Sequence, residues 1–494
     1  MVGITSYGVH IPRYRMDRKI IFQQMGWFNM GNAAIARGEK AVANHDEDAN
    51  TMAHAAAQEC MGTRECRELD GLYMASMSFP YANRQNAVVV SSALGSRSDI
   101  RTADFTGAVK SGTTAMISAL DAIAAGSAGS IMVCAADCRF AKPGSAQEIT
   151  FGDGAAAVLL GKEKVVAAFK GSFSVSHDFM DSRRLANERF DRVWEDRWIR
   201  DEGYMKIIPE AALGIARKYQ MQIGEFEKIV IACPNEGALK GLAKVVGARP
   251  DQIQGNFVDQ IGDTGVAMPL LMMVAAIEES KPGDKILVLS YGYGSDALCF
   301  EVTEEMEKNR QERKGMKAHL AAKEALTLYT KYQAFRDLVP FDIGIRGESI
   351  SPTAMTVLNR QGSTVSALVG VKCKACGTPQ FPSHTVCVNP ACGAVGQMEP
   401  YRFSHRTGKV VYFAADHLAF SWDPPLGYVL IDFPEGGRIW LELTDHNLDQ
   451  IQIGTPVEMT FRRKYSDPYR GHIVYYWKAK PVKQSLATRG DDHD

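Results

Sequence analysis

TADFTGAVKSGTTAMISAL, residues 102–120, has the pattern of a short strand, a turn rich in Gly and Thr, and an apolar helix. The helix continues to a stop of small residues, and SIMVCAAD at 130–137 then has the continuous apolarity of a buried strand. Residues 258–292 repeat this order as VDQIGDTGVAMP, LLMMVAAIEESKPG and KILVLSYG. Two copies of one layout predict an internally duplicated α/β fold, in which the helices after 110 and 265 lie buried between two sheets.

Length and charge exclude several classes of function. A chain of 494 residues is long enough for two or three cores. It carries 56 Lys and Arg against 57 Asp and Glu, so no overall field attracts nucleic acid or an anionic membrane. No apolar run approaches the roughly 20 residues of a membrane span, and MVGITSYGVHIPRYRMD lacks the pattern of a signal peptide. We therefore expect a cytoplasmic protein without nucleic-acid or membrane partners.

The ten cysteines fall into two groups. Four of them form a Cys-x2-Cys-x10-Cys-x4-Cys pattern within VKCKACGTPQFPSHTVCVNPACGAV, a spacing typical of a tetrahedral structural zinc site built from two turns. Four thiolates leave no open position, so this zinc is expected to hold structure without acting as a Lewis acid; His384 in place of one cysteine is the alternative. The predicted ligands are Cys373, Cys376, Cys387 and Cys392. The six scattered cysteines are expected to be small buried hydrophobes.

After about residue 303 the composition changes. Residues 304–335 are charged and then amphipathic, which predicts a solvated helical connector. From about 342 the chain has short β-rich runs at regular spacing, among them GYVLIDF, RIWLELTD and HIVYYWKAK, which predict a small barrel of OB type.

The first 300 residues resemble hydroxymethylglutaryl-CoA synthases of the archaeal type, within the thiolase superfamily. The resemblance is carried by GITSYGVHIPRYRMD at 3–17, SFPYANRQNAVVVSSALG at 78–95, SAQEITFGDGAAAVLLG at 145–161 and PGDKILVLSYGYGSDALCF at 282–300. The remainder is similar to the zinc-ribbon and OB-fold domain that accompanies many thiolase-like proteins. The resemblance implies a duplicated five-layer α/β fold followed by a zinc ribbon and an OB-type β-barrel. The expected segments are two thiolase-like halves (1–165 and 166–303), a linker (304–345), a zinc-ribbon region (346–400), an OB-fold (401–485) and a disordered tail (486–494).

The family's catalytic residues do not carry over. The position of the acylated cysteine is occupied by Val109, that of the general acid/base glutamate by Met77, and that of the histidine before a Pro-Asn pair by Ala232. Valine, methionine and alanine supply neither a nucleophile nor a base, so acyl transfer through a cysteine is expected to be absent. Two neighbours are weaker candidates for the nucleophile: Cys233, which strand alternation points away from the face of Ala232, and Ser111, which has no base.

Polar groups remain near the presumed centre. Asp263 and Tyr293 are the candidate acid/base residues, with an N-cap and loop packing as their respective structural alternatives. The expected substrate pocket comprises Met77, Val109, Ser111, Ala232 and Asn235. Lys240 and Lys244 are candidate contacts for the phosphates of coenzyme A, with simple surface solvation as the alternative. Residues 180–205, rich in Arg and Trp, are a candidate wall or lid, with a solvated helix as the alternative.

Three hypotheses follow for an acyl-CoA-binding protein. The first is a C–C bond-forming or bond-cleaving enzyme that works on acyl-CoA by aldol or retro-aldol chemistry without a cysteine. The second is a non-catalytic subunit that binds acyl-CoA or supports an active thiolase-like partner. The third is an acyl-transferring synthase or thiolase with an unrecognised nucleophile. The fold family implies a homodimer, or a heteromer with a second thiolase-like chain.

Overall fold

The computed structural model describes residues 1–482 except 63, 65, 311–313 and 349–352. The chain divides into two compact units, Met1–Pro340 and Phe341–Asp494, which are treated separately below. The predicted tail, 486–494, lies outside the described residues. Among the described residues, no helix is both long and apolar enough to cross a bilayer.

The first unit is built on one nine-stranded mixed sheet with two halves. The half from the earlier part of the chain has the order β1-β7-β6-β4-β5, and the later half has the order β11-β12-β13-β8. The halves join where β1 pairs with the first residues of β8, Gly3 opposite Ala168 and Ile4 opposite Ala167. The strands are β1 (Gly3–His10), β4 (Gly71–Ala75), β5 (Arg101–Phe105), β6 (Ile131–Asp137), β7 (Gly154–Gly161), β8 (Ala167–Ser176), β11 (Lys228–Ile231), β12 (Lys285–Tyr291) and β13 (Gly294–Val302).

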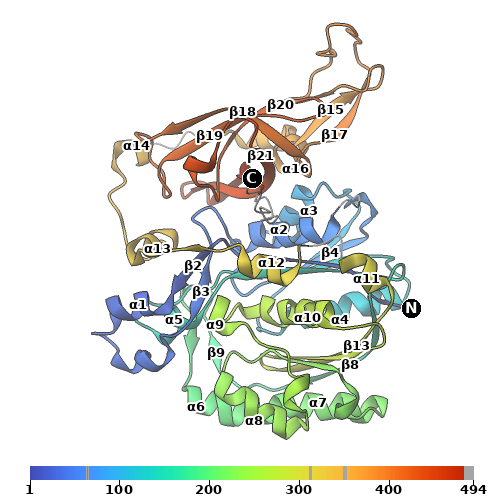
Figure 1. The fold of residues 1–494 in the computed structure, drawn as a ribbon, viewed down its shortest axis with the longest axis vertical. Coiled ribbons are helices and arrows are strands. Elements are labelled where there is room, and N and C mark those ends of the chain that lie inside the picture. Colours follow the sequence, from blue (N-terminus) through green and yellow to red (C-terminus); the bar gives the residue numbers. More distant parts are fainter. Residues whose placement is uncertain (63, 65, 311–313, 349–352, 483–494) are drawn as a thin grey trace, which may run out of the picture. The chain divides into compact units, whose positions relative to one another are not determined.

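Six helices complete the layers. α4 and α10 lie between the two halves of the sheet, while α2 and α3 cover the outer face of one half and α7 and α8 the outer face of the other (Figure 1). This is the internally duplicated α/β arrangement that the repeated layout predicts. The helices are α2 (Ala49–Met61), α3 (Asn86–Ala93), α4 (Ser111–Ala124), α7 (Met205–Tyr219), α8 (Glu236–Val246) and α10 (Met268–Glu279).

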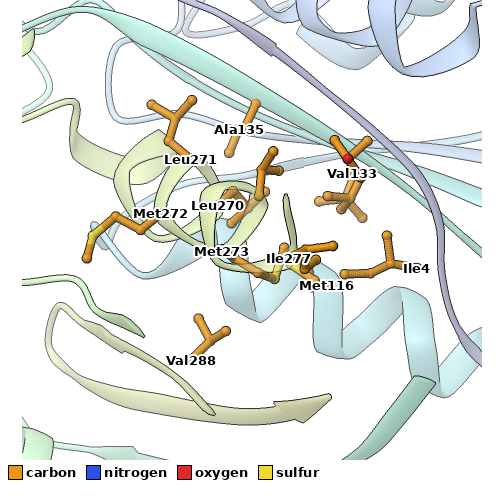
Figure 2. Close-up of a cluster of buried hydrophobic side chains, with 14 of the residues drawn as sticks. Ile4, Met116, Val133, Ala135, Leu270, Leu271, Met272, Met273, Ile277 and Val288 are labelled. Carbon is orange, nitrogen blue, oxygen red and sulfur yellow. The ribbon is translucent and has the colours of Figure 1, made fainter. Parts of the chain in front are cut away.

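The two central helices are held by apolar contacts. Every residue of α10 from Met268 to Ile277 is buried, as expected for a helix with sheet on two sides. Leu270, Met273 and Ile277 of α10 lie close to Met116 of α4 and to Val288 in β12 (Figure 2). Because side chains all along α4 and α10 are packed in this core, the N-terminal ends of both helices are held in place.

The second copy of the layout begins differently from the first. Val258–Ile261 forms the short helix α9, where the sequence predicts a strand. In the first half, β5 forms the edge strand of the sheet. At the corresponding place in the second half there is only one parallel bridge among the described residues, between Ile253 and Ile229 of β11. Phe257, in the left-handed region with φ of 56°, turns the chain directly into α9.

The described residues between 304 and 335 differ from the expected solvated connector, because several of them are buried in the first unit. These are Met306, Met316, Leu326, Tyr332 and Phe335. This part contains α11 (Glu305–Arg310), α12 (Gly315–Ala321), β14 (Glu324–Ala325) and α13 (Tyr329–Phe335). Other elements of the first unit are β2 (Tyr14–Asp17), α1 (Arg18–Met25), η1 (Met30–Ile35), β3 (Glu39–Val42), η2 (Cys66–Glu68), η4 (Ile223–Glu225) and η5 (Pro250–Gln252).

The described part of the second unit contains two small sheets and several short helices. A three-stranded sheet has the order β16-β15-β17, and a five-stranded antiparallel sheet has the order β20-β19-β18-β21-β22. A bridge between Leu443, after β20, and Ala479 of β22 links the two ends of the larger sheet. The elements are α14 (Gly344–Glu348), α15 (Met355–Arg360), α16 (Gly362–Ala367), β15 (Val369–Cys373), β16 (Pro379–Gln380), β17 (Met398–Arg402), β18 (Thr407–Asp416), β19 (Leu426–Asp432), β20 (Arg438–Glu442), η7 (Leu448–Gln450), β21 (Pro456–Asp467) and β22 (His472–Pro481).

Candidate functional site

A cavity of about 300 Å³ lies in the first unit beside the N-terminal ends of the two central helices. Val109 precedes α4, and Met268 begins α10. The parallel strands β11 and β12 end at the same cavity, with Ala232 and Tyr291 on its surface. Carboxyl ends of parallel strands and N-terminal ends of helices are a common setting for ligand sites in α/β folds.

Four of the predicted pocket and acid/base residues line this cavity: Val109, Ala232, Asn235 and Asp263. Met77 and Ser111 are not among its lining residues. Ser111 is buried as the first residue of α4, and the backbone N–H of Met77 donates to Asp137 at 2.8 Å. Asn235 caps α8, because its side-chain oxygen accepts a hydrogen bond from the N–H of Ala238 at 2.9 Å.

The turn that holds Val109 is pressed against the loop after β12. Gly292, with φ of 151°, approaches so closely that a Cβ there would lie 2.8 Å from the backbone nitrogen of Val109. Only glycine combines this φ with this approach. The N-terminal end of α4 and the loop 292–294 therefore form one fixed surface beside the cavity.

Cys233 is not placed to act as a nucleophile in the cavity. It packs with Ile229 and Ile231 on the side of β11 opposite to Ala232, as the alternation of the strand predicts. Its side chain is fully buried, and burial raises the pKa of the thiol to about 12. A thiol with this pKa holds a negligible thiolate fraction at neutral pH, so it is inert as a nucleophile.

Asp263 belongs to a buried ionic group around Arg139. Its carboxylate accepts a hydrogen bond from the N–H of Gly265 at 2.9 Å and lies 3.3 Å from an Arg139 terminal nitrogen. The Nε of Arg139 donates to Asp191 at 2.8 Å, and the guanidinium stacks 3.7 Å from the centre of the Phe151 ring. Although burial alone would lower the pKa of Arg139, the two carboxylates raise it above its usual value. The Arg139 guanidinium is therefore a fixed positive charge at the cavity, and the carboxylates of Asp191 and Asp263 balance it.

Tyr293 is placed differently from Asp263. It adopts a left-handed conformation with φ of 50°, and its hydroxyl donates to the backbone carbonyl of Ser182. Tyr293 is not among the residues that line the cavity. Its role as an acid or base stays a prediction.

Sequence reasoning missed Asp181, Tyr204 and Tyr291, which do line the cavity. Asp181 and Tyr204 lie in the segment 180–205 that the sequence marks as a wall, so their region was predicted but their side chains were not. Tyr291 is the last residue of β12, and its position at the carboxyl end of a predicted buried strand was an available signal.

The segment 180–205 contributes side chains to the lining of the cavity, while its role as a lid stays a prediction. It supplies Asp181, Ser182, Val193, Asp196, Ile199 and Tyr204 to the lining. The segment contains β9 (Ser182–Arg183), β10 (Arg192–Val193), α6 (Asp196–Trp198) and a π-helix, η3 (Ile199–Tyr204). The lining also includes residues of α5 (Ala146–Thr150) and Gly265 of η6 (Gly265–Ala267).

Basic residues lie at and near one side of the cavity. Arg18 and Arg37 line it, and Arg37 pairs with Glu236 at the start of α8 at 3.1 Å. Lys240 and Lys244 are exposed one and two turns further along α8 and are not among the lining residues. Their contact with the phosphates of coenzyme A stays a prediction.

The four clustered cysteines of the second unit are brought together as predicted. The ligand atoms of Cys373, Cys376, Cys387 and Cys392 all lie within 4.8 Å of one another. The sulfur–sulfur distances are 3.9 Å for Cys373 and Cys392 and 3.5 Å for Cys376 and Cys387. Tetrahedral zinc with bonds of about 2.3 Å to sulfur places sulfurs about 3.8 Å apart. The donor set therefore fits a structural zinc ion.

Comparisons with known proteins agree on the first unit. The chain is 31% identical over 346 residues to a hydroxymethylglutaryl-CoA synthase of Methanopyrus kandleri, covering 69% of this chain and 98% of the relative. It is 29% identical over 345 residues to the synthase of Methanocaldococcus jannaschii, covering 68% and 99%. No family model matches the sequence.

Solved structures show the same fold at lower identity. MvaS in complex with 3-hydroxy-3-methylglutaryl coenzyme A superimposes with a TM-score of 0.61 at 19% identity, over 71% of this chain and 94% of that one. 3-Oxoacyl-[acyl-carrier-protein] synthase III from Aquifex aeolicus gives 0.53 at 18% identity, over 61% and 100%. From its sequence relatives and its duplicated fold, the chain belongs to the hydroxymethylglutaryl-CoA synthase family of the thiolase superfamily.

Proposed function

We propose that this protein forms or breaks a C–C bond next to the thioester of an acyl-CoA by aldol-type chemistry, without an acyl-cysteine intermediate. The observation that carries the proposal is the cavity itself. It keeps a fixed polar group, Arg139 with Asp263, beside the central helices, while Val109 and Ala232 occupy the family's nucleophile and histidine positions. The relatives are named as synthases that act on an acyl-CoA, which supports the substrate class.

Aldol cleavage needs no nucleophile on the protein. A base removes the proton of a 3-hydroxyl group, the C2–C3 bond breaks, and a carbonyl compound leaves. The electron pair passes to the thioester as an enolate, which is then protonated at C2. The protein must stabilise the enolate oxygen and move these two protons. The N-terminal end of α4 beside Val109 supplies a positive dipole for the oxygen.

Asp263 and Tyr293 are the proton-transfer candidates from the sequence, and the geometry supports them unequally. Asp263 lines the cavity, but both of its oxygens are already engaged, one by Gly265 and the other by Arg139. Tyr293 donates its hydroxyl to Ser182. In this proposal Asp263 keeps Arg139 in place, and any proton transfer by Tyr293 requires its bond to Ser182 to open.

A non-catalytic subunit is the second candidate function. It is favoured by the inert thiol of Cys233, with its pKa raised to about 12, and by the loss of the base at Ala232. Such a subunit would assemble with a second thiolase-like chain that keeps the nucleophile, whereas the enzyme would form a homodimer. The edge strands β5 and β11 have a free side in the described part of the sheet, which provides a place for pairing in either case.

The proposal for the second unit is a zinc ribbon followed by an OB-type barrel. The four cysteines at the ends of β15 and in the following loops would hold the zinc ion, and it would fix these loops without taking part in the reaction. The link between the two ends of the five-stranded sheet at Leu443 and Ala479 supports a closed barrel.

The test is a mass-spectrometric screen of purified protein with 3-hydroxyacyl-CoA and 3-oxoacyl-CoA thioesters, each with and without free coenzyme A. Cleavage of a 3-hydroxy substrate without added coenzyme A is the expected result. Cleavage of 3-oxo substrates only with coenzyme A would be thiolysis and would contradict the proposal. Binding of coenzyme A without any turnover would favour the non-catalytic subunit.

A further inference from the structure

We propose that Tyr291 and Asp181 are the pair that moves the two protons of the reaction. This inference rests on the proposed function and deepens it, because it assigns the acid and the base to residues that the sequence did not single out. Both residues line the cavity and come from different parts of the unit, Tyr291 from the end of β12 and Asp181 from the start of the wall segment.

The Tyr291 hydroxyl is buried and available. The residue is 7% exposed, its hydroxyl makes no hydrogen bond of ordinary length and angle, and the Asp181 carboxyl is a polar group beside it. A buried hydroxyl without a well-formed hydrogen bond is costly, and such groups concentrate at sites that bind a ligand. Burial, and next the charge of nearby Asp181, raise the pKa of Tyr291, so the phenol stays protonated as a donor.

The position of the Tyr291 ring is fixed from the wall. Its ring meets that of Tyr204 edge to face, with centroids 4.7 Å apart. A Cβ on Gly203 would overlap the Tyr291 hydroxyl, so glycine at 203 leaves the space that the hydroxyl occupies. Gly203 and Tyr204 belong to the π-helix η3, an element that is frequent at functional sites.

Asp181 has the properties of a base. The residue is 8% exposed, and one of its carboxylate oxygens accepts a hydrogen bond from the N–H of Ser182 at 2.5 Å. Burial raises the pKa of this carboxyl above its usual value, and the neighbouring Tyr291 hydroxyl opposes the rise. A raised pKa strengthens a carboxylate as a proton acceptor. Asp263, in contrast, is paired with Arg139.

The steps balance between these two residues. The Asp181 carboxylate takes the proton of the 3-hydroxyl, and the C2–C3 bond breaks to give the carbonyl product and the thioester enolate. The Tyr291 hydroxyl gives its proton to C2, and the protonated Asp181 returns a proton to the Tyr291 oxygen. No proton is gained or lost, and both residues end in their starting states.

The experiment compares Tyr291→Phe and Asp181→Asn with the full-length protein in two assays. One follows cleavage of the 3-hydroxyacyl-CoA, and the other follows exchange of the C2 hydrogens of the product acyl-CoA in D2O. We expect each variant to lose at least about 100-fold in cleavage, and Tyr291→Phe to lose exchange to a similar degree. Because the Tyr291 hydroxyl makes no hydrogen bond of ordinary length and angle, Tyr291→Phe should change the melting temperature little.

Two controls make the result specific. Tyr219→Phe removes a hydroxyl near Ser172, away from the cavity, and should leave both rates unchanged. Tyr293→Phe tests the neighbouring tyrosine. If its cleavage rate falls further than that of Tyr291→Phe, the assignment of Tyr291 is wrong. If the wild type cleaves the substrate and both Tyr291→Phe and Asp181→Asn keep rates within about threefold of the wild-type rate, the assignment of this pair is wrong. The proposed function would still stand in that case. A wild type that neither cleaves nor exchanges would overturn the proposed function and the pair with it.

Discussion

Val109 and Ala232 line the same cavity from opposite halves of the duplicated unit: Val109 precedes α4 of the first half, and Ala232 follows β11 of the second. Both positions carry apolar side chains, so neither residue can act there as a nucleophile or a base. In the proposed function the two positions belong together, because a site without a nucleophile at Val109 has no need of a base at Ala232.

Restoring both residues is expected to restore acylation. Val109→Cys alone places a thiol without a base and should remain unmodified after incubation with acetyl-CoA. The double variant Val109→Cys with Ala232→His should acquire an acyl group, detectable as added mass on the peptide that contains residue 109. Val109→Ser with Ala232→His is the matched control. Equal labelling of the single and double cysteine variants would show that the two positions do not act together.

Gly292→Ala should destabilise the first unit by two effects. The new Cβ would meet the Val109 backbone nitrogen, and alanine is strained at φ of 151°. Backbone strain of this kind costs about 1–3 kcal/mol. Gly283→Ala is the control for strain alone, because Gly283 has φ of 92° and nothing within 4 Å of its Cβ position. A larger fall of melting temperature in Gly292→Ala than in Gly283→Ala is expected, and equal falls would contradict the close approach.

The buried Lys40 should make stability depend on pH. Its ammonium group donates to the Glu148 carbonyl at 2.5 Å, and burial, followed by the charge of Arg336, lowers its pKa to about 7. In the unfolded chain the lysine keeps its proton up to the usual pKa of 10.5. Between these values the unfolded state binds more protons, so this group makes the free energy of unfolding rise with pH.

Lys40→Met should remove that rise. The difference in unfolding free energy between wild type and variant is expected to increase from pH 7 to pH 10 by at most about 1.4 kcal/mol per pH unit. Urea unfolding at several pH values measures it, and the comparison cancels the groups that the two proteins share. A difference that stays constant over this range would mean that Lys40 is charged in the folded protein.

The four-cysteine site predicts one zinc ion per chain. Elemental analysis of the purified protein should find it, and Cys387→Ser should lose it together with part of the stability of the second unit. His384→Ala should retain the metal, because four thiolates already complete the coordination. Loss of zinc in His384→Ala, with retention in one of the cysteine variants, would assign the histidine as a ligand.

Periodicity predicted the central helices and the alternation that turns Cys233 away from the cavity, because both depend on local apolar patterning. It did not predict α9, where the left-handed Phe257 replaces a strand by a turn of helix. Tyr291 could be recognised as the end of a buried strand, but the pattern did not show that Tyr291, and not Tyr293, lines the cavity. In a continuous strand the side chains of residues 291 and 293 would point to the same side of the sheet. The chain instead reverses at Gly292 and Tyr293, both with positive φ, so this alternation ends at Tyr291. Asp181 is positioned by pairing within the wall segment, which a sequence does not display.

The apolar support of α4 and α10 has an evolutionary consequence. Since these helices are anchored along their length by residues such as Met116 and Leu270, the fold makes few demands on the side chain at the turn that precedes α4. We therefore expect the scaffold to tolerate different side chains at position 109. Under the proposed function, this tolerance would let the chemistry at the turn change while the fold around it stays the same.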